Sequence, residues 1–319
     1  MSQLEKQLSF ELKRYAVQKG VIDSVFIGGG TPSCVDAKLY EGVFRLLDGY
    51  LAKDIEITTE ANPNSATKEW LKSMRDMGIN RVSFGVQSFD ESKLKALARA
   101  HTKDQAIQAI EDAFDIGYEN ISLDLIYNYQ NDTKELLLDD ITQAFKLPIN
   151  HISAYELTIE DGTKFALTPQ VKQDNENLAF FVQEQIVANG FEHYEISNYG
   201  RYKSTHNIGY WKLQEYIGVG SGAVGMKGNH RYYPTTNLDS YLANPLMCEI
   251  EELSAKDIQT EKIFLGLRSL VGIQSQILDK DMLQRARILV DEEKLYLKNG
   301  IFYNPNYFVA DEIALYILG

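Results

Sequence analysis

The stretch Val25–Pro32 (VFIGGGTP) decides the fold that the sequence predicts. Its first three residues are β-branched or aromatic, which is typical of a strand buried on both faces. Glycines directly after such a strand let the backbone approach a ligand closely and expose its N–H groups, while Pro32 stiffens the exit from the turn. Three glycines alone fit a tight structural turn equally well, so the interpretation depends on the rest of the chain.

The composition of the chain is that of an ordinary globular protein, and its few cysteines suggest a reducing environment. Its 319 residues, 44% of them hydrophobic, suffice for one large domain and a smaller one. The formal net charge of -13 disfavours nucleic acid as a partner. No apolar run approaches the ~20 residues that cross a bilayer, and a charged helix stands where a signal peptide would be. The two cysteines, Cys34 and Cys248, match no metal or disulfide spacing, so we expect a cytoplasmic protein.

Strands alternate with helices over the first half of the chain. The pattern predicts strands over 24–27, 55–59, 81–86, 121–127 and 151–158. It predicts helices over 2–19, 39–50, 67–78, 90–99, 103–116 and 133–145. Such an alternation indicates right-handed βαβ units and a parallel sheet, which binds ligands at the carboxyl ends of its strands.

Polar side chains occur at that end of four successive strands. Thr31, Glu60 and Gln87 each lie at or just beyond the end of a predicted strand, and Asp124 interrupts an apolar one. Because the carboxyl ends of parallel strands meet at one edge, these residues should line a common site. Taken singly, each has a structural alternative; Glu60, for example, could cap the helix that follows Pro63.

The alternation lapses after residue 165. A helix over 178–188 and a strand over 191–196 precede a Gly- and Tyr-rich stretch, 198–233, that shows little periodicity. Helical patterns return over 254–267 and 278–290 and in a last helix that ends at Leu318, with a short hairpin within 293–303. This arrangement suggests a small winged-helix-like unit. The acidic charge favours docking of this unit against the first domain over DNA binding.

Several motifs together resemble a known family. IGGGTP (27–32), EANP (60–63), GVQSF (85–89), Arg99 and DLIY (124–127) are similar to the radical S-adenosylmethionine (SAM) proteins related to oxygen-independent coproporphyrinogen III oxidase. HNIGYW (206–211) resembles the HNxxYW signature of the HemW-type haem chaperones, one branch of that family. YIGVGSGAVG (216–225) and the C-terminal unit also match, so the resemblance covers nearly the whole chain.

The resemblance implies a fold and a domain organisation. The fold is α/β: a partial (β/α) radical-SAM-type barrel whose first strand is missing, with a small C-terminal winged-helix-like domain. We expect the barrel core over 1–165, a barrel extension carrying the HNxxYW loop over 166–250, and the winged-helix-like domain over 251–319.

The resemblance also implies a SAM site. Its residues would be those of the glycine turn and the strand ends: Gly28, Gly29, Gly30, Thr31, Glu60, Gln87, Arg99 and Asp124. Their chemistry suits the ligand. Glu60 or Asp124 can accept hydrogen bonds from ribose hydroxyls or the ammonium group, and Arg99 can pair with the carboxylate. Gln87 can do either. Arg99 alone would be taken for a solvated surface charge, but the whole set at matching positions favours the SAM site.

Two departures from the family pattern stand out. The CxxxCxxC segment that holds a [4Fe-4S] cluster is absent, and neither Cys34 nor Cys248 can replace it by spacing. We therefore expect the cluster only in a full-length family form, and we predict that this chain does not cleave SAM. A truncated product or an internal start is the favoured explanation, and a cluster-free paralogue is the alternative. The second departure is Asn128-Tyr129-Gln130, where the family has a Gly-Leu-Pro turn.

Three functions compete. The first is a haem-binding, haem-transfer chaperone, whose partners would be haem and a haem-accepting protein, with a peripheral membrane protein as one candidate. The second is a radical SAM enzyme that decarboxylates coproporphyrinogen III. The third is a nucleotide-dependent dehydrogenase with Glu60 on a ribose, but Ser33 stands where the dinucleotide fingerprint has its third glycine. The HNxxYW stretch favours the chaperone. The sequence does not indicate an oligomeric state.

His206 is the predicted ligand of haem iron. The chain has five histidines, and only His206 lies in a motif, with Tyr210 and Trp211 close behind it. Imidazole is a good axial ligand for haem iron, and flat aromatic rings can pack on the macrocycle. The structural alternative is a histidine hydrogen-bonded within an ordered loop. His230, in a Gly-rich loop, is the second candidate.

Overall fold

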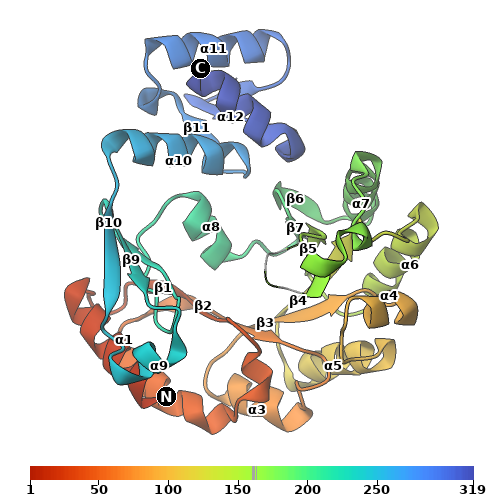
Figure 1. The fold of residues 1–319 in the computed structure, drawn as a ribbon, viewed down its shortest axis with the longest axis vertical. Coiled ribbons are helices and arrows are strands. Elements are labelled where there is room, and N and C mark those ends of the chain that lie inside the picture. Colours follow the sequence, from red (N-terminus) through yellow and green to blue (C-terminus); the bar gives the residue numbers. More distant parts are fainter. Residues whose placement is uncertain (160–161, 163) are drawn as a thin grey trace. The chain divides into compact units, whose positions relative to one another are not determined.

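The computed structural model describes residues 1–159, 162 and 164–319 (Figure 1). Its α-helices are α1 (Ser2–Arg14), α2 (Glu41–Leu47), α3 (Lys68–Asp76), α4 (Glu91–Ala96), α5 (Lys103–Ile116), α6 (Lys134–Ala144), α7 (Glu176–Ala188), α8 (Thr205–Trp211), α9 (Leu238–Ala243), α10 (Ala255–Leu267), α11 (Lys280–Asp291) and α12 (Ala310–Leu318). Its strands are β1 (Ile22–Ile27), β2 (Leu51–Ala61), β3 (Arg81–Gln87), β4 (Asn120–Tyr127), β5 (His151–Glu156), β6 (Glu192–Glu195), β7 (Asn198–Gly200), β8 (Gly225–Lys227), β9 (His230–Pro234), β10 (Cys248–Glu252), β11 (Ile273–Gln274), β12 (Tyr296–Lys298) and β13 (Ile301–Tyr303).

One seven-stranded sheet is built from the strands between Ile22 and Gly200. Its strand order is β1-β2-β3-β4-β5-β7-β6, and the neighbours from β2 to β5 pair in parallel. The last two strands, β7 and β6, are antiparallel additions. The sheet curls into a half-barrel, so the predicted partial (β/α) barrel of the radical-SAM type is confirmed.

The two faces of the sheet differ in chemistry. On β3, Val82, Phe84 and Val86 are fully buried on the face that α5 covers, and α6 and α7 pack on β4 in the same way. Figure 1 shows these helices on the outer side of the curved strands. Side chains alternate along a strand, so Ser83 and Gln87 lie on the opposite, inner face. Polar groups of the sheet therefore gather on the inner face.

Strand β1 departs from the expectation of a strand buried on both faces. Five of its six residues are half-buried and Asp23 is exposed. The reason is its place in the sheet, since β1 stands at the end of the strand order and has one sheet neighbour, β2, among the described residues. The apolar run Val25–Ile27 still marks the strand correctly.

The chain divides into two compact units. One comprises Met1–Ser24, Leu39–Ile55 and Ser204–Gly319, and the other comprises Val25–Lys38 and Glu56–Lys203. We refer to them as the terminal unit and the sheet unit. The three-domain division predicted from the sequence remains a prediction.

The C-terminal part of the terminal unit has a hydrophobic core of its own. Helices α10, α11 and α12 and the small sheet β11-β13-β12 enclose buried side chains that include Ile263, Leu267, Phe302 and Ile317. The guanidinium group of Arg268 makes two hydrogen bonds to Asp311, each 2.8 Å long, which tie α10 to α12. Three helices with a small antiparallel sheet agree with the winged-helix-like unit expected here.

The Gly- and Tyr-rich stretch is more regular than its sequence suggests. The HNxxYW segment, which we expected as a loop, forms helix α8. The hydroxyl of Ser204 accepts a hydrogen bond from the amide of Asn207 at 3.3 Å and caps this helix. A helix of seven residues that contains Gly209 and two aromatic residues shows no clear apolar periodicity, which explains why the pattern was missed.

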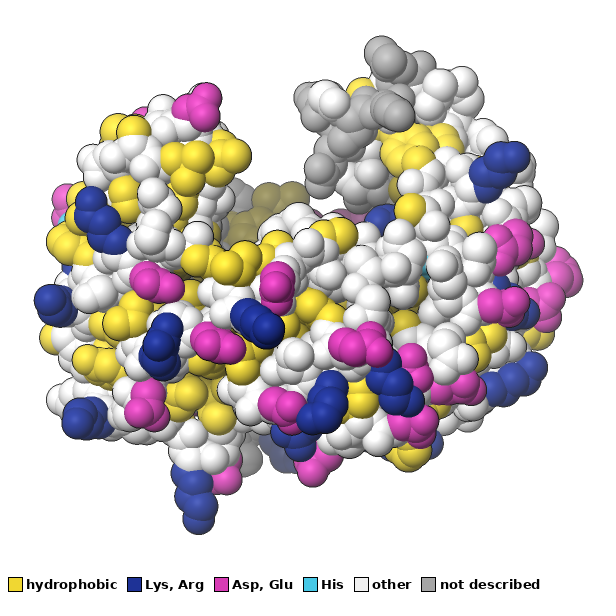
Figure 2. Space-filling view, turned by 90° about the horizontal axis from the view of Figure 1, so that it is seen from below, with side chains coloured by type: hydrophobic (Ala, Val, Ile, Leu, Met, Phe, Trp, Pro, Cys, Tyr) yellow, Lys and Arg dark blue, Asp and Glu magenta, His cyan; other side chains and the backbone are white. Residues whose placement is uncertain are grey.

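Charges of both signs cover the surface. On the face in Figure 2, lysine and arginine side chains are interspersed with aspartate and glutamate. Among the helices of residues 1–159, 162 and 164–319, none combines the length and the apolar character needed to cross a membrane.

Candidate functional site

The glycine turn is built around the carboxyl group of Glu60. A Cβ atom on Gly28 would lie 2.5 Å from Cε1 of Phe26 and 3.1 Å from both Cδ and Oε2 of Glu60, so a larger residue here would displace the Phe26 ring and crowd the carboxyl group. The amide of Gly29 donates a hydrogen bond to that carboxyl group. Gly29 and Gly30 have φ angles of 79° and 83°, in the left-handed region that glycine tolerates best. Burial raises the pKa of Glu60, and the Gly29 hydrogen bond opposes this rise.

Ser33 joins the turn after β1 to the turn after β2. Its hydroxyl accepts a hydrogen bond from the amide of Asn62 at 3.0 Å and lies 2.7 Å from the hydroxyl of Ser65. Ser33 is buried, and the carbonyl of Thr31 accepts a hydrogen bond from Cys34 at 3.0 Å. The glycine turn and the loop after Glu60 are therefore held as one rigid edge.

Asp124 lies on the inner face in the middle of the sheet. The hydroxyl of Ser83, on the neighbouring strand, donates to its Oδ1 at 3.4 Å. Burial raises the pKa of Asp124 to about 6; a hydrogen bond from Ser153 lowers it, and the nearby Glu60 raises it further. Arg81 contributes an attractive charge. Two carboxyl groups with raised pKa values thus share this face.

Gln87 is the last residue of β3 and has a positive φ angle of 69°. The strand pairing shifts register between Phe84 and Gln87, as it does at a β-bulge, and such bulges re-aim side chains next to functional sites. A Cβ atom on Gly85 would lie 3.1 Å from Nε2 of Gln87 and 3.4 Å from Oδ1 of Asn62. Gly85 therefore leaves room for these two amide groups to approach the same point.

Arg99 follows helix α4. The residue as a whole is exposed, but its guanidinium group is partly desolvated. This desolvation lowers the pKa of Arg99, and the carboxylate of Asp124 opposes the decrease. Arg99 and Asp124 are therefore within electrostatic reach of each other.

His206 belongs to the terminal unit, whereas the residues described above belong to the sheet unit. It stands in the first turn of α8, where Nδ1 is 3.2 Å from the hydroxyl of Ser24. The ring of Tyr210, one helical turn on, meets the imidazole edge to face with 4.8 Å between centroids. Tyr216 packs on Tyr210 in the same manner at 4.7 Å. The imidazole is thus part of an aromatic cluster.

Three of the other histidines have structural roles. His151 is fully buried between the hydroxyls of Ser122 and Tyr194, at 2.7 Å from each. His193 stacks on Tyr199, and Nε2 of His101 lies 2.9 Å from the carbonyl oxygen of Val86. His230 is half-buried on β9 and stacks loosely on Tyr232, with 6.5 Å between ring centroids.

The sheet unit therefore brings most of the predicted residues together. The glycine turn contacts Glu60, Glu60 interacts with Asp124, and Asp124 interacts with Arg99. Gln87 shares the carboxyl edge, whereas Thr31 supports the turn through its backbone. Sequence reasoning missed Arg81, Ser83 and Ser153, which surround Asp124. The signal was present on β3, where polar or small residues at 81, 83, 85 and 87 alternate with apolar ones.

Comparison with known proteins first shows the superfamily and the fold of this chain. Residues 5–143 match the radical SAM superfamily. The solved structure of coproporphyrinogen III oxidase HemN from Escherichia coli, described as a radical SAM enzyme, aligns with a TM-score of 0.79. The alignment covers 99% of this chain and 82% of that one at 16% sequence identity, which shows the fold alone. The chain has a radical SAM fold.

Curated relatives narrow the class to one family. The heme chaperone HemW of Lactococcus lactis is 34% identical over 286 residues, covering 85% of this chain and 74% of that protein. HemW of Bacillus subtilis is 32% identical over 80% of this chain and 72% of its own length, and HemW of Escherichia coli is 39% identical over 64% and 56%. The chain belongs to the HemW family, which confirms the resemblance seen in its motifs.

The residues present do not fit the [4Fe-4S] cluster that the superfamily implies. The sequence has two cysteines, one in each unit, and such clusters are held by thiolates. In the part of the chain that the structure describes, no group of three or more His, Cys, Asp or Glu residues could hold a metal ion. A [4Fe-4S] cluster therefore plays no part in the function proposed for this chain. SAM fits better, because a glycine turn, two partly buried carboxyl groups and a cation lie on one edge.

Proposed function

We propose that this chain is a haem-binding, haem-transfer chaperone of the HemW type that also binds SAM. Membership of the HemW family carries the proposal, because several relatives of that name align along most of the chain. The chain spans between 56% and 74% of the length of the three relatives described above. Its activity, cargo and partners are therefore proposals.

SAM would bind in the sheet unit at the carboxyl edge of β1 to β4. Gly30 is exposed in the same turn, and its amide can donate to a polar group of the ligand. Glu60 and Asp124 would accept from the ammonium group or the ribose hydroxyls, and Arg99 would pair with the carboxylate. Gln87 can serve as donor or acceptor. SAM, when bound, supplies a sulfonium that is activated in radical SAM chemistry.

Haem would bind in the terminal unit with His206 as its axial ligand. The hydroxyl of Ser24 lies 3.2 Å from Nδ1 and helps to orient the imidazole. Tyr210 and Tyr216 extend an aromatic surface beside the imidazole, and such surfaces pack well against a macrocycle. His230 is the competing ligand.

The chaperone function is tested by measuring the transfer of haem from this protein to an acceptor protein. The protein is loaded with haem, freed of excess haem by gel filtration, and mixed with a haem-free globin as acceptor. We expect stoichiometric loading and a globin spectrum that appears faster than haem dissociates into buffer. Failure to retain haem on the column would overturn the proposal. Turnover of coproporphyrinogen III without haem retention would favour the oxidase instead.

A further inference from the structure

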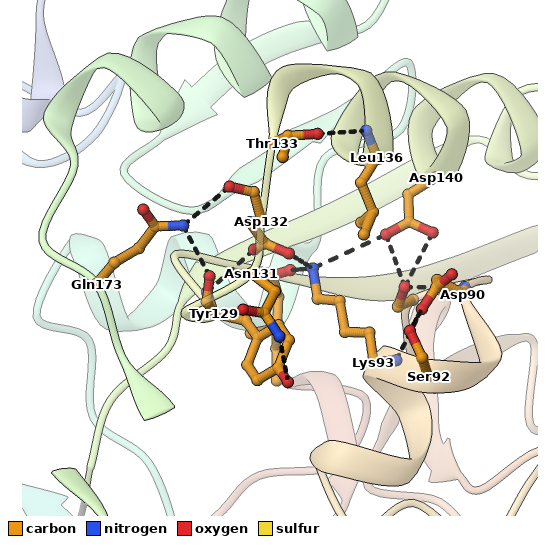
Figure 3. Close-up of polar contacts among 12 residues, drawn as sticks. Asp90, Ser92, Lys93, Tyr129, Asn131, Asp132, Thr133, Leu136, Asp140 and Gln173 are labelled. Carbon is orange, nitrogen blue, oxygen red and sulfur yellow. Dashed lines mark hydrogen bonds and ion pairs between the residues drawn. The ribbon is translucent and has the colours of Figure 1, made fainter. Parts of the chain in front are cut away.

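A fully buried lysine anchors helix α4 to three other parts of the sheet unit. The side chain of Lys93 has an exposed fraction of 0%. Its ammonium group donates to the carbonyl oxygen of Ile126 at 2.7 Å and lies 2.8 Å from Oδ1 of Asp132. A second carboxylate, Asp140 on α6, is 3.9 Å away. Figure 3 shows the ammonium group between these two carboxylates. A buried charge persists only with partners of this kind.

Each carboxylate holds a further piece of backbone. Oδ2 of Asp132 accepts from the amide of Tyr129 at 3.0 Å. Asp140 accepts from the amide of Phe89 at 2.6 Å and from the hydroxyl of Ser88 at 2.8 and 3.0 Å. Lys93 thus links the loop that precedes α4, the end of β4 and the loop that follows it.

The loop after β4 begins with Asn128-Tyr129-Gln130. Asn128 adopts a φ angle of 65°, and Tyr129 packs in a small core with Leu97 and Val171. Gln173 donates to the carbonyl oxygens of Tyr129 and Asp132 at 2.8 and 3.0 Å, from the far side of the loop (Figure 3). The Lys93–Asp132 ion pair therefore helps to fix the loop that follows β4.

Arg99 is aimed by the segment that Lys93 anchors. The amide of Arg99 donates to the carbonyl of Leu94 at 2.9 Å, directly after Ala98, which has a φ angle of 53°. On the other side of Arg99, His101 is fixed to the carbonyl of Val86. Lys93 and His101 therefore tie the two flanks of Arg99 to the carboxyl ends of β4 and β3.

We infer that Lys93, through its ion pair with Asp132, is a positioning residue that places Arg99 to receive a carboxylate. This inference rests on the proposed SAM site, in which Arg99 pairs with the carboxylate of the ligand. Lys93 itself is sealed from the ligand by its burial. Its effect should therefore be confined to ligands that carry the carboxylate.

The experiment compares two ligands that differ in that group. SAM carries the aminocarboxypropyl chain, and 5′-deoxy-5′-methylthioadenosine lacks it. Their dissociation constants are measured by calorimetry for the parent, Arg99→Gln, and the double variant Lys93→Met/Asp132→Asn. The double variant removes both charges of the ion pair, and its asparagine oxygen still accepts from Tyr129. Lys95→Met, an exposed lysine on the same helix, is the matched control.

We expect Arg99→Gln and the double variant each to weaken SAM binding about tenfold or more, the usual effect of losing one charged hydrogen bond. Combining all three substitutions should weaken it no further, because Lys93 acts through Arg99. Binding of methylthioadenosine should not change, and Lys95→Met should bind both ligands as the parent does. If the double variant does not fold, Asp132→Asn alone breaks the ion pair and the same comparison applies.

Two results would overturn the inference while leaving the SAM site standing. One is an unchanged SAM affinity in the folded double variant, when Arg99→Gln is impaired. The other is an equal loss of both ligands, which marks a general structural role. An Arg99→Gln variant that binds SAM like the parent, or a parent that binds no SAM, would instead contradict the proposed site itself.

Discussion

The hydroxyl of Ser24 lies 3.2 Å from Nδ1 of His206, so strand β1 orients the imidazole on helix α8 within the terminal unit. A hydrogen-bond partner on one ring nitrogen sets the tautomer and the direction of the other nitrogen. The Ser24 hydroxyl therefore contributes to the orientation of the imidazole that we propose as the haem ligand.

Removing the Ser24 hydroxyl should therefore weaken haem binding without abolishing it. Loss of such an orienting partner usually lowers metal affinity roughly 10-fold to 100-fold. We expect Ser24→Ala to fall in the lower part of that range in a haem titration. Ser221→Ala, an exposed serine of the same unit, serves as the control. Equal affinity of Ser24→Ala and the control would show that Ser24 does not orient the ligand.

SAM affinity should depend on pH through Asp124. Burial raises the pKa of Asp124 to about 6, so this carboxyl group is neutral at pH 5 and anionic at pH 7. Only the anion attracts the ammonium group of SAM, and the affinity should therefore rise with pH across this window. Asp124→Asn should flatten the profile in calorimetric titrations, and methylthioadenosine, which has no ammonium group, should show no such rise. A profile that persists in Asp124→Asn would assign the titration to Glu60.

Glu195 should lower stability at alkaline pH. It is 1% exposed, its Oε1 has no hydrogen-bond partner among the described residues, and burial raises its pKa from 4.5 to about 7. The folded state thus holds a proton that the unfolded state releases, so stability falls as pH rises from about 4.5 to about 7. The full penalty, on the order of 3 kcal/mol, is present above that window.

Glu195→Gln removes this ionisation. We expect the variant to gain stability over the parent at pH 8, by up to roughly 3 kcal/mol in urea unfolding, and little at pH 4. Glu192→Gln, an exposed residue on the same strand, is the control and should show no such pH dependence. A gain of equal size at both pH values would point to packing rather than to ionisation.

The chain should not assemble a stoichiometric [4Fe-4S] cluster. It has two cysteines, and they lie in different units. After anaerobic reconstitution with iron and sulfide, we expect iron counts well below one cluster per chain and no 5′-deoxyadenosine from SAM. The Cys34→Ser/Cys248→Ser variant should give the same iron count as the parent. A full cluster that the double variant loses would show that these cysteines do serve as ligands.

The sheet and most of its polar edge could be predicted from local sequence. Apolar runs that end in glycine, glutamate or glutamine marked β1, β2 and β3, because strand residues and turn residues differ strongly in type. Element ends were less certain: the helix expected over 2–19 ends at Arg14, where Tyr15 closes it and Ala16 turns to a φ angle of 50°.

Contacts between residues distant in sequence could not be predicted. In the sequence, Lys93 resembles Lys95, the exposed lysine on the same helix, and only the fold shows its pairing with Asp132. Helix α8 was also missed, since its capping by Ser204 carries less signal than a long apolar stripe. The environment of Glu195 falls in the same class, because Tyr155 on β5 lies within electrostatic reach of it and β7 pairs with its strand.

The haem site proposed for this chain depends on His206 as the ligand of the iron. The most direct test is a haem titration followed by visible absorption for the parent, His206→Ala and His230→Ala. We expect His206→Ala to shift the Soret band and to weaken haem binding at least tenfold, because the axial bond is lost, while His230→Ala should match the parent. An unchanged Soret band and an unchanged haem affinity in His206→Ala would exclude His206 as the ligand. A loss of haem affinity confined to His230→Ala would identify His230, on β9, as the ligand instead.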